Sequence, residues 1–145
     1  MGNSGAESVR ASGGCLCGAV RYQVHGPLRP VVSCHCEMCR RTSGHYVAAT
    51  QAKAEDLELV EDRGLKWYRS SEVARRGFCG ECGGNLFWAR DGAEQISIMA
   101  GTLDPPTGLE TVLHICIESK SDYHALPAEV AVSEGIGHSV VIPES

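Results

Sequence analysis

Aromatic residues and long hydrophobic runs are scarce in this chain of 145 residues. Only 6% of the residues are aromatic, so we expect Val, Leu, Ile and Ala to form most of the core. No apolar run is long enough to span a membrane, and the polar start of the chain lacks the apolar region of a secretory signal. Excess positive charge is also missing: the formal net charge is -5, which disfavours a nucleic-acid partner. We therefore expect a cytoplasmic protein that binds neither membranes nor nucleic acids.

Short hydrophobic segments separated by turn residues predict a mainly β fold. In the stretch 19–24, Val20, Tyr22 and Val24 alternate with polar residues, which is typical of a strand with one buried face. Further strands are expected at 31–34, 45–50, 57–60, 65–70, 73–78, 85–88, 95–100 and 111–117. Their regular spacing favours antiparallel sheets. The segments 37–44 and 53–58 are each expected to form a single helical turn.

Cysteine, by contrast, is plentiful, with eight residues in the chain. In a reducing compartment, clustered cysteines indicate metal binding or catalysis rather than disulfides. Cys116 stands alone in an apolar strand, where we expect a buried core residue. The other seven form three groups: Cys15 with Cys17, then Cys34, Cys36 and Cys39, then Cys79 with Cys82.

The pair Cys79 and Cys82 has the spacing of a metal-binding knuckle, and the glycines in and after it suit a tight turn. A redox pair is the alternative, but no βαβ pattern accompanies it. A knuckle supplies two of the four ligands of a structural zinc ion. Cys15 and Cys17 can supply the other two, because their side chains would point the same way in a regular strand. These four residues predict a closed structural zinc site that contributes folding free energy.

This assignment leaves three residues, the cysteine trio of Cys34, Cys36 and Cys39, for a second zinc ion. Three protein ligands and one open position are characteristic of catalytic zinc sites. His35 is a candidate fourth ligand, but in an extended segment it points away from its neighbours, so we expect it to face solvent or to lie behind the ligands. Two alternatives stay open at this point. Cys15 and Cys17 could instead join two members of the trio, and an iron–sulfur cluster is possible although the known ferredoxin spacings are absent.

The cysteine groups and their flanking residues resemble those of the glutathione-dependent formaldehyde-activating enzyme family, also called the CENP-V/GFA domain family. The similarity extends from about residue 13 to residue 126. The motifs that carry it are GGCLCG at 13–18, CHCEMCRR at 34–41, FCGECGGNL at 78–86 and AGTLDPP at 100–106. Tyr123 stands where the family often has Trp, and the chain is shorter than the founding enzyme.

The resemblance implies a β-tent fold, with antiparallel sheets organised around a structural zinc site. It implies the same division of the cysteines, with Cys15, Cys17, Cys79 and Cys82 structural and the trio catalytic. The family's founding activity is the condensation of glutathione with formaldehyde to S-hydroxymethylglutathione, a carbon–sulfur lyase reaction. We accordingly expect a flexible segment at 1–12, a zinc-binding domain at 13–126, and a C-terminal extension at 127–145 that packs on the domain or trails from it.

The expected reaction joins or separates a small, glutathione-like thiol and a small aldehyde. The trio's zinc would take the substrate thiol as its fourth ligand and hold it as a thiolate. Arg40 and Arg41 are candidates for binding substrate carboxylates or offsetting the site's charge, and a solvated surface pair is the alternative. His45 and Tyr46 are candidates for the pocket lining, with packing as the alternative. The competing function is a non-catalytic zinc module that binds a protein partner.

Overall fold

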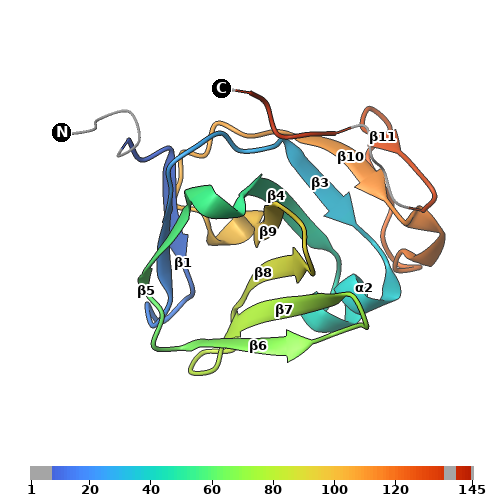
Figure 1. Ribbon diagram of the computed structural model, residues 1–145. Helices are drawn as coiled ribbons and strands as arrows, with labels where there is room; N and C mark the ends of the chain where they lie inside the picture. The colour runs from blue at the N-terminus through green and yellow to red at the C-terminus, as the bar shows by residue number, and fades with distance from the viewer. Residues whose placement is uncertain (1–7, 136–139, 145) are drawn as a thin grey trace.

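The computed structural model describes residues 8–135 and 140–144. In this part of the chain the strands form two sheets (Figure 1). The smaller sheet has the order β1–β2–β5, with β1 at Ala11–Gly14, β2 at Arg21–Val24 and β5 at Leu57–Glu61. The larger sheet has the order β11–β10–β3–β4–β9–β8–β7–β6. Its strands are β3 (Val31–Cys34), β4 (Val47–Lys53), β6 (Leu65–Arg69), β7 (Ala74–Cys79), β8 (Asn85–Arg90), β9 (Gln95–Met99), β10 (Thr111–Ile115) and β11 (Ala131–Val132).

The mainly β prediction is confirmed, and every strand expected from the sequence is present with ends shifted by a few residues. Most neighbouring strands are antiparallel, but β10 is parallel to both β3 and β11. The strand β1 was not predicted, because its sequence, Ala-Ser-Gly-Gly, has no hydrophobic alternation. It is held by pairing with β2, and by an isolated bridge between Gly13 and Leu103.

Both ends of the expected domain carry regular structure. The strand β1 begins at Ala11, within the segment expected to be flexible, and residues 1–7 of that segment lie outside the described residues. After residue 126, β11 pairs with the edge of β10. The Ser133 N–H donates to the His114 carbonyl at 2.8 Å, and the Cys116 N–H donates to the Gly135 carbonyl at 2.9 Å. Residues 131–135 of the C-terminal extension therefore pack along β10 and the residue that follows it.

Helical structure is confined to short segments. The helix α2 (Glu37–Ser43) has seven residues, so it is longer than the single turn expected there. Its C-cap, Gly44, has a φ of 87°, a left-handed conformation that glycine adopts without strain. Three 3₁₀ turns complete the described chain: η1 (Ala54–Asp56), η2 (Ala100–Thr102) and η3 (Ile117–Ser119). No helix in the described residues is long and apolar enough to cross a membrane.

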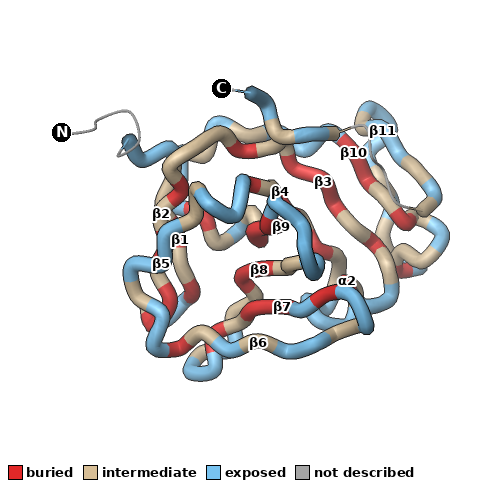
Figure 2. Tube along the Cα trace, in the orientation of Figure 1, coloured by how far each residue is buried: buried red, intermediate tan, exposed pale blue. Residues whose placement is uncertain are grey.

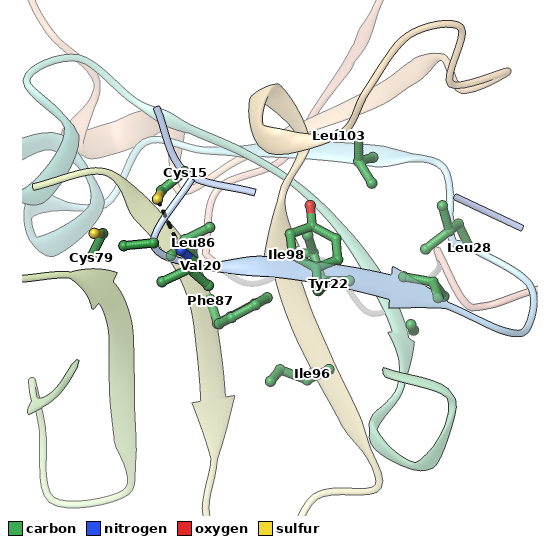
Figure 3. Packing of buried hydrophobic residues seen from close by; sticks show 13 residues of the cluster. Cys15, Val20, Tyr22, Leu28, Cys79, Leu86, Phe87, Ile96, Ile98 and Leu103 are labelled. Carbon is green, nitrogen blue, oxygen red and sulfur yellow. Dashed lines mark hydrogen bonds between the residues drawn. The ribbon is translucent and has the colours of Figure 1, made fainter. Parts of the chain in front are cut away.

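The main hydrophobic core fills the space between the two sheets (Figures 2 and 3). Tyr22 of β2 and Phe87 of β8 meet edge to face, with ring centroids 5.4 Å apart. The buried Tyr22 hydroxyl lies 2.6 Å from Thr102 Oγ1, and Thr102 donates its own proton to the Met99 carbonyl. Tyr22 is therefore the donor in that contact. Aliphatic residues make up most of the remaining core: Ala19, Val20, Val24, Leu28, Ala52, Leu86, Ile96, Ile98 and Leu103, together with Cys15 and Cys79.

A second, smaller hydrophobic cluster lies between β4, β9 and α2. Its buried members are Cys39, Val47, Ala49 and Met99. Trp88 and the partly buried Cys34 and Cys36 pack against them. The two cysteine-rich motifs of the sequence therefore occupy different parts of the interior, one at the edge of the main core and one in this smaller cluster.

Candidate metal centres

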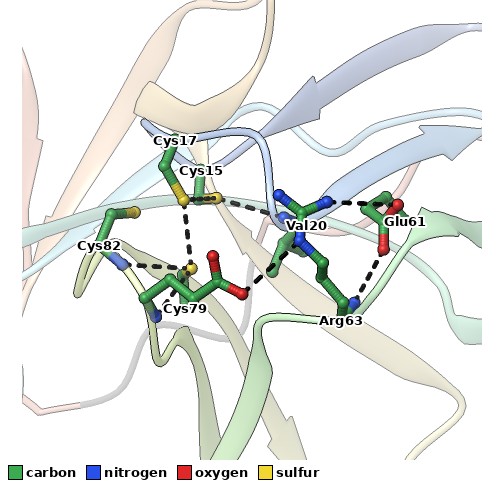
Figure 4. Close-up of polar contacts among 8 residues, drawn as sticks. Cys15, Cys17, Val20, Glu61, Arg63, Cys79 and Cys82 are labelled. Carbon is green, nitrogen blue, oxygen red and sulfur yellow. Dashed lines mark hydrogen bonds and ion pairs between the residues drawn. The ribbon is translucent and has the colours of Figure 1, made fainter.

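The first candidate centre brings together two segments that are far apart in sequence. The Sγ atoms of Cys15, Cys17, Cys79 and Cys82 all lie within 4.8 Å of one another. Cys17 Sγ is 3.8 Å from Cys15 Sγ and 3.8 Å from Cys79 Sγ (Figure 4). These separations are too long for a disulfide, whose sulfurs lie about 2 Å apart. They match the edge of a sulfur tetrahedron around zinc, which is about 3.8 Å for a metal–sulfur distance of about 2.3 Å.

The Cys15 and Cys17 side chains converge by a different route from the one expected. The strand β1 ends at Gly14, and both cysteines lie in the turn that leads to β2, so a regular strand does not align them. The Cys15 N–H donates to the Val20 carbonyl at 3.0 Å and closes this turn. The Val20 N–H in turn donates to Cys15 Sγ at 3.3 Å. The turn thus fixes the sulfur with a backbone donor, which stabilises a thiolate.

The knuckle has the geometry expected from its glycines. Cys79 is the last residue of β7, and its carbonyl accepts from the Gly83 N–H at 2.8 Å. Gly83 has a φ of 81°, a conformation that disfavours other residues. The N–H groups of Glu81 and Cys82 donate to Cys79 Sγ at 3.3 and 3.4 Å. Backbone donors aimed at sulfur and four converging thiols together fit a tetrahedral divalent ion.

An exposed arginine connects the outside of the knuckle to the small sheet. Arg63 lies 3.5 Å from the Glu61 carboxylate, at the end of β5, and 3.6 Å from the Glu81 carboxylate in the knuckle. Figure 4 shows the Arg63 and Glu61 side chains beside the four cysteines. Exposed pairs of this kind contribute little to stability, and two backbone hydrogen bonds, from the Gly64 N–H to the Ala19 carbonyl and from the Gly80 N–H to the Gly64 carbonyl, connect the same segments.

The second candidate centre is built by the junction between a strand and a helix. Cys34 is the last residue of β3, Cys36 is the N-cap of α2, and Cys39 lies in its first turn. Cys36 Sγ accepts from the Cys39 N–H at 3.3 Å, so the capping bond itself orients one of the sulfurs. The three Sγ atoms lie within 4.8 Å of one another, and no His, Cys, Asp or Glu of the described chain joins the group as a fourth donor.

The three thiols share negative charge unequally in the absence of an ion. Hydrogen bonds from the Cys34 and Cys39 thiols lower the pKa of Cys36 to about 2. The contact with Cys36 raises the pKa of Cys34 to about 12, and the contacts with Cys34 and Cys36 raise the pKa of Cys39 above its usual range. A first negative charge is therefore readily held, while two more in so small a volume require a cation. This donor set fits a divalent metal ion.

Cys116 is buried, with 8% of its surface exposed, as the sequence led us to expect. It has a φ of 56°, an uncommon value for a residue with a side chain. Burial raises the pKa of its thiol, and a hydrogen bond with Cys34 opposes that rise. Cys116 therefore borders the trio, although it does not belong to the group whose sulfurs lie within 4.8 Å of one another.

Of the two surroundings expected for His35, solvent or a position behind the ligands, the first is wrong. Only 1% of its surface is exposed, its Nε2 lies 2.9 Å from His114 Nδ1, and its ring stacks on Tyr46 at 4.8 Å. Burial and the neighbouring His114 lower the pKa of His35 to about 4. The sequence pattern correctly predicted that His35 points away from Cys34, but it did not reveal that β10 is the parallel neighbour of β3 in the sheet.

The four residues expected to bind substrate lie in different surroundings. Arg41 is exposed and forms an ion pair with Glu37 one helical turn earlier, at 2.9 Å, while Arg40 is half-buried on α2. His45 Nδ1 lies 3.1 Å from the Tyr123 hydroxyl. Tyr46 stacks on both His35 and His124, with centroid distances of 4.8 and 5.5 Å, and the two histidine rings lie 6.0 Å from each other. His45 and Tyr46 thus belong to an aromatic cluster around His35, and their role towards a substrate stays a prediction.

A further residue at the trio was missed by the sequence reasoning. Arg76 of β7 is buried, with 6% of its surface exposed, and its Nη2 lies 3.7 Å from Cys39 Sγ. Its neighbour Arg75 faces the other way and lies 4.0 Å over the Trp67 ring. A signal for this was present: adjacent residues of a strand point to opposite faces, so one of two consecutive arginines had to turn inward.

The chain is similar to proteins of one family. The profile of the glutathione-dependent formaldehyde-activating enzyme family matches residues 10–119. An uncharacterized lyase of Schizosaccharomyces pombe is 30% identical over 112 residues, which cover 76% of this chain and 80% of that protein. A putative glutathione-dependent formaldehyde-activating enzyme of Halomonas elongata is 30% identical over 123 residues, 77% of each chain. A crystal structure of a Rhodobacter sphaeroides protein has a TM-score of 0.55 at 29% identity and covers 65% of this chain and 88% of that one.

Proposed function

The chain belongs to the glutathione-dependent formaldehyde-activating enzyme family, and on this basis we propose that it is a zinc-dependent carbon–sulfur lyase. Its reaction forms or cleaves an adduct of a thiol and an aldehyde, of the S-hydroxymethylglutathione type. Cys34, Cys36 and Cys39 hold the catalytic zinc ion. A separate structural zinc ion is held by the four-cysteine group Cys15, Cys17, Cys79 and Cys82.

One observation carries the proposal: the two cysteine groups differ in the number of sulfur ligands that they supply. The four-cysteine group supplies a full tetrahedron of sulfurs, which suits a structural ion. The trio supplies three sulfurs, with no fourth donor from the described His, Cys, Asp and Glu residues. A site that served only to bind a protein partner would gain nothing from an open position, whereas a catalytic site requires one.

When bound at the trio, zinc would supply a substrate thiolate at neutral pH by coordinating the thiol sulfur. In the forward direction a bond forms between this sulfur and the carbonyl carbon. The carbonyl oxygen takes up a proton, so that the proton lost by the thiol is balanced. The chain itself supplies the surroundings: Val47, Met99 and Trp88 pack around the trio and exclude water from one side of it. This exclusion strengthens the electrostatic interactions within the site.

We also propose roles for the residues near α2, which follow from its geometry. Arg40 and Arg41 lie in the last turn of the helix whose first turn contains Cys39, so their guanidinium groups are candidates for the carboxylates of a glutathione-like thiol. Arg41 would have to exchange its Glu37 partner for the substrate. His45 and Tyr46 would act at the margin of this surface, next to the exposed Tyr123.

The proposal is tested by combining metal analysis with a rate measurement. Purified protein is expected to contain two equivalents of zinc and to accelerate adduct formation from ¹³C-formaldehyde and glutathione, followed by exchange NMR. The variant Cys39→Ser should lose about one equivalent of zinc and at least about 100-fold in catalysed rate, since a trio with two thiolates binds the ion weakly. Met38→Ser, a change of the exposed neighbour on the same helix, is the matched control and should keep both.

The alternative function gives a different outcome in the same experiment. If the protein holds two zinc ions and neither the wild type nor any variant accelerates the reaction with a panel of small thiols and aldehydes, the non-catalytic zinc module is favoured. If Cys39→Ser retains the wild-type rate, the assignment of the trio as the catalytic site is wrong, whatever the zinc content.

A further inference from the structure

Arg76 lacks the partners that a buried arginine ordinarily has. Only 6% of its surface is exposed, and among the described residues its side chain forms one hydrogen bond, from Nη2 to Cys39 Sγ at 3.7 Å. Its Nε is buried without an acceptor. The ion pairs of the described chain involve other cations, so no carboxylate within it forms a salt bridge with Arg76.

A guanidinium group stays protonated in proteins, so the positive charge of Arg76 needs a counter-charge nearby. The groups that can provide it are the sulfurs of the trio, because Nη2 of Arg76 lies 3.7 Å from Cys39 Sγ. The sheet fixes the backbone of Arg76 opposite Tyr68 of β6 and Trp88 of β8, and the residue is buried there. The guanidinium group of Arg76 is thus a buried cation in contact with the trio.

We propose that Arg76 is a specificity-determining residue, which makes the open position of the trio favour an anionic sulfur over a neutral ligand. The inference rests on the proposed function and specifies which of the two substrates occupies the metal. Three thiolates and one divalent ion carry one net negative charge, and Arg76 cancels it. A fourth thiolate then approaches a neutral centre, whereas without Arg76 it would approach a negative one. A neutral ligand, including an aldehyde carbonyl, gains no comparable advantage.

The size of the effect follows from the contact distance. With Nη2 at 3.7 Å from Cys39 Sγ, and a metal–sulfur bond of about 2.3 Å, the ion lies at most about 6 Å from the guanidinium nitrogen. For a bound sulfur about 6 Å from the guanidinium group, and an effective dielectric constant of about 20 to 40, the unit charge of Arg76 changes the affinity for an anionic ligand by roughly 10- to 100-fold. The affinity for a neutral ligand should change by less than about threefold.

The experiment measures ligand affinity rather than turnover, with cobalt(II) in place of zinc so that the fourth ligand is visible in the absorption spectrum. The protein is titrated with 2-mercaptoethanol, which binds as a small thiolate, and separately with imidazole, which binds as a neutral ligand. Arg76→Met removes the charge, Arg76→Gln keeps an N–H donor without the charge, and Arg76→Lys keeps the charge. Arg75→Met is the matched control, because it removes the same charge from the adjacent residue on the other face of β7.

Arg76→Met and Arg76→Gln are expected to weaken 2-mercaptoethanol binding by roughly 10- to 100-fold and to leave imidazole binding nearly unchanged. Arg76→Lys and Arg75→Met should bind both ligands as the wild type does. The inference is overturned if both neutral variants lose affinity for the two ligands equally, as a purely structural role would require, or if neither variant changes thiolate affinity. If the wild type binds neither ligand, the fourth position is not open, and the proposed function fails together with the inference.

Discussion

Replacing Cys82 by serine should destabilise the fold far more than replacing Cys39 by serine. The reason lies in the length of chain that each sulfur group closes. The four-cysteine group joins Cys17 to Cys79, which are 62 positions apart. The trio closes only the short segment from Cys34 to Cys39. A cross-link that closes a loop of about 60 residues raises the free energy of the unfolded chain by about 4 kcal/mol, because it removes conformational entropy. One that closes about five residues raises it by about 2 kcal/mol.

Packing points in the same direction. Cys15 and Cys79 belong to the main core, and Cys79 is fully buried there, so loosening of the four-cysteine group disturbs the contact between both sheets. Cys39 belongs to the smaller cluster beside α2. For a chain of this length, a difference of about 2 kcal/mol corresponds to roughly 4–8 °C in the midpoint of thermal unfolding, with Cys82→Ser the lower of the two.

The assay is thermal unfolding of the zinc-loaded variants, followed by circular dichroism at one protein concentration. The same scans are repeated with a strong chelator, which removes the metal from the wild type and from both variants. The chelator should remove most of the difference between the two variants. Equal midpoints for the zinc-loaded forms, or a lower midpoint for Cys39→Ser, would show that the division into a structural and a catalytic group is wrong.

Two further predictions concern stability. Burial lowers the pKa of His114, and lowers that of His35 to about 4, so the unfolded chain binds more protons as the pH falls below 6.5. The free energy of unfolding should therefore decrease between pH 6.5 and pH 4, by about 2–3 kcal/mol for His35 alone. Urea titrations over this pH range should show a shallower decrease for His114→Gln than for the wild type. An identical decrease in the two proteins would contradict this prediction. Gly83→Ala should cost about 1 kcal/mol or more because of its positive φ, whereas Gly101→Ala, which has open space and no positive φ, should change the urea midpoint little.

The sequence predicted what depends on short-range pattern and chemistry. Alternating residues located the strands, and the spacing of the cysteines separated them into the same two groups that the structure brings together. The helix after Cys36 was underestimated, because its stability derives from capping by that cysteine and by Gly44 rather than from residue propensity. The strand β1 was missed for a related reason, since pairing with β2 compensates for its lack of hydrophobic residues.

What the sequence could not predict depends on which strands become neighbours. The burial of His35 follows from the parallel pairing of β3 with β10, two strands separated by about half of the chain. The alternation of the strand predicts that one of the two consecutive arginines points inward, but the contact of Arg76 with the trio follows from the placement of β7 between β6 and β8. Parallel pairs and distant contacts of this kind leave no local periodicity in the sequence. The residues predicted to bind substrate, such as Arg40 and Arg41, were therefore ones close in sequence to the trio.

The placement of β7 links the two candidate centres. This strand carries Arg76 on the side of the trio and ends at Cys79, which belongs to the four-cysteine group. Arg76 and Cys79 are three residues apart in a strand that pairs with β6 without a register shift, so their side chains point to opposite faces of the sheet. This alternation lets Arg76 face one sulfur cluster while Cys79 faces the other. An ion in the four-cysteine group would thus fix the end of the strand that positions the cation of the trio, so a group without contact to substrate can still determine how precisely that charge is placed.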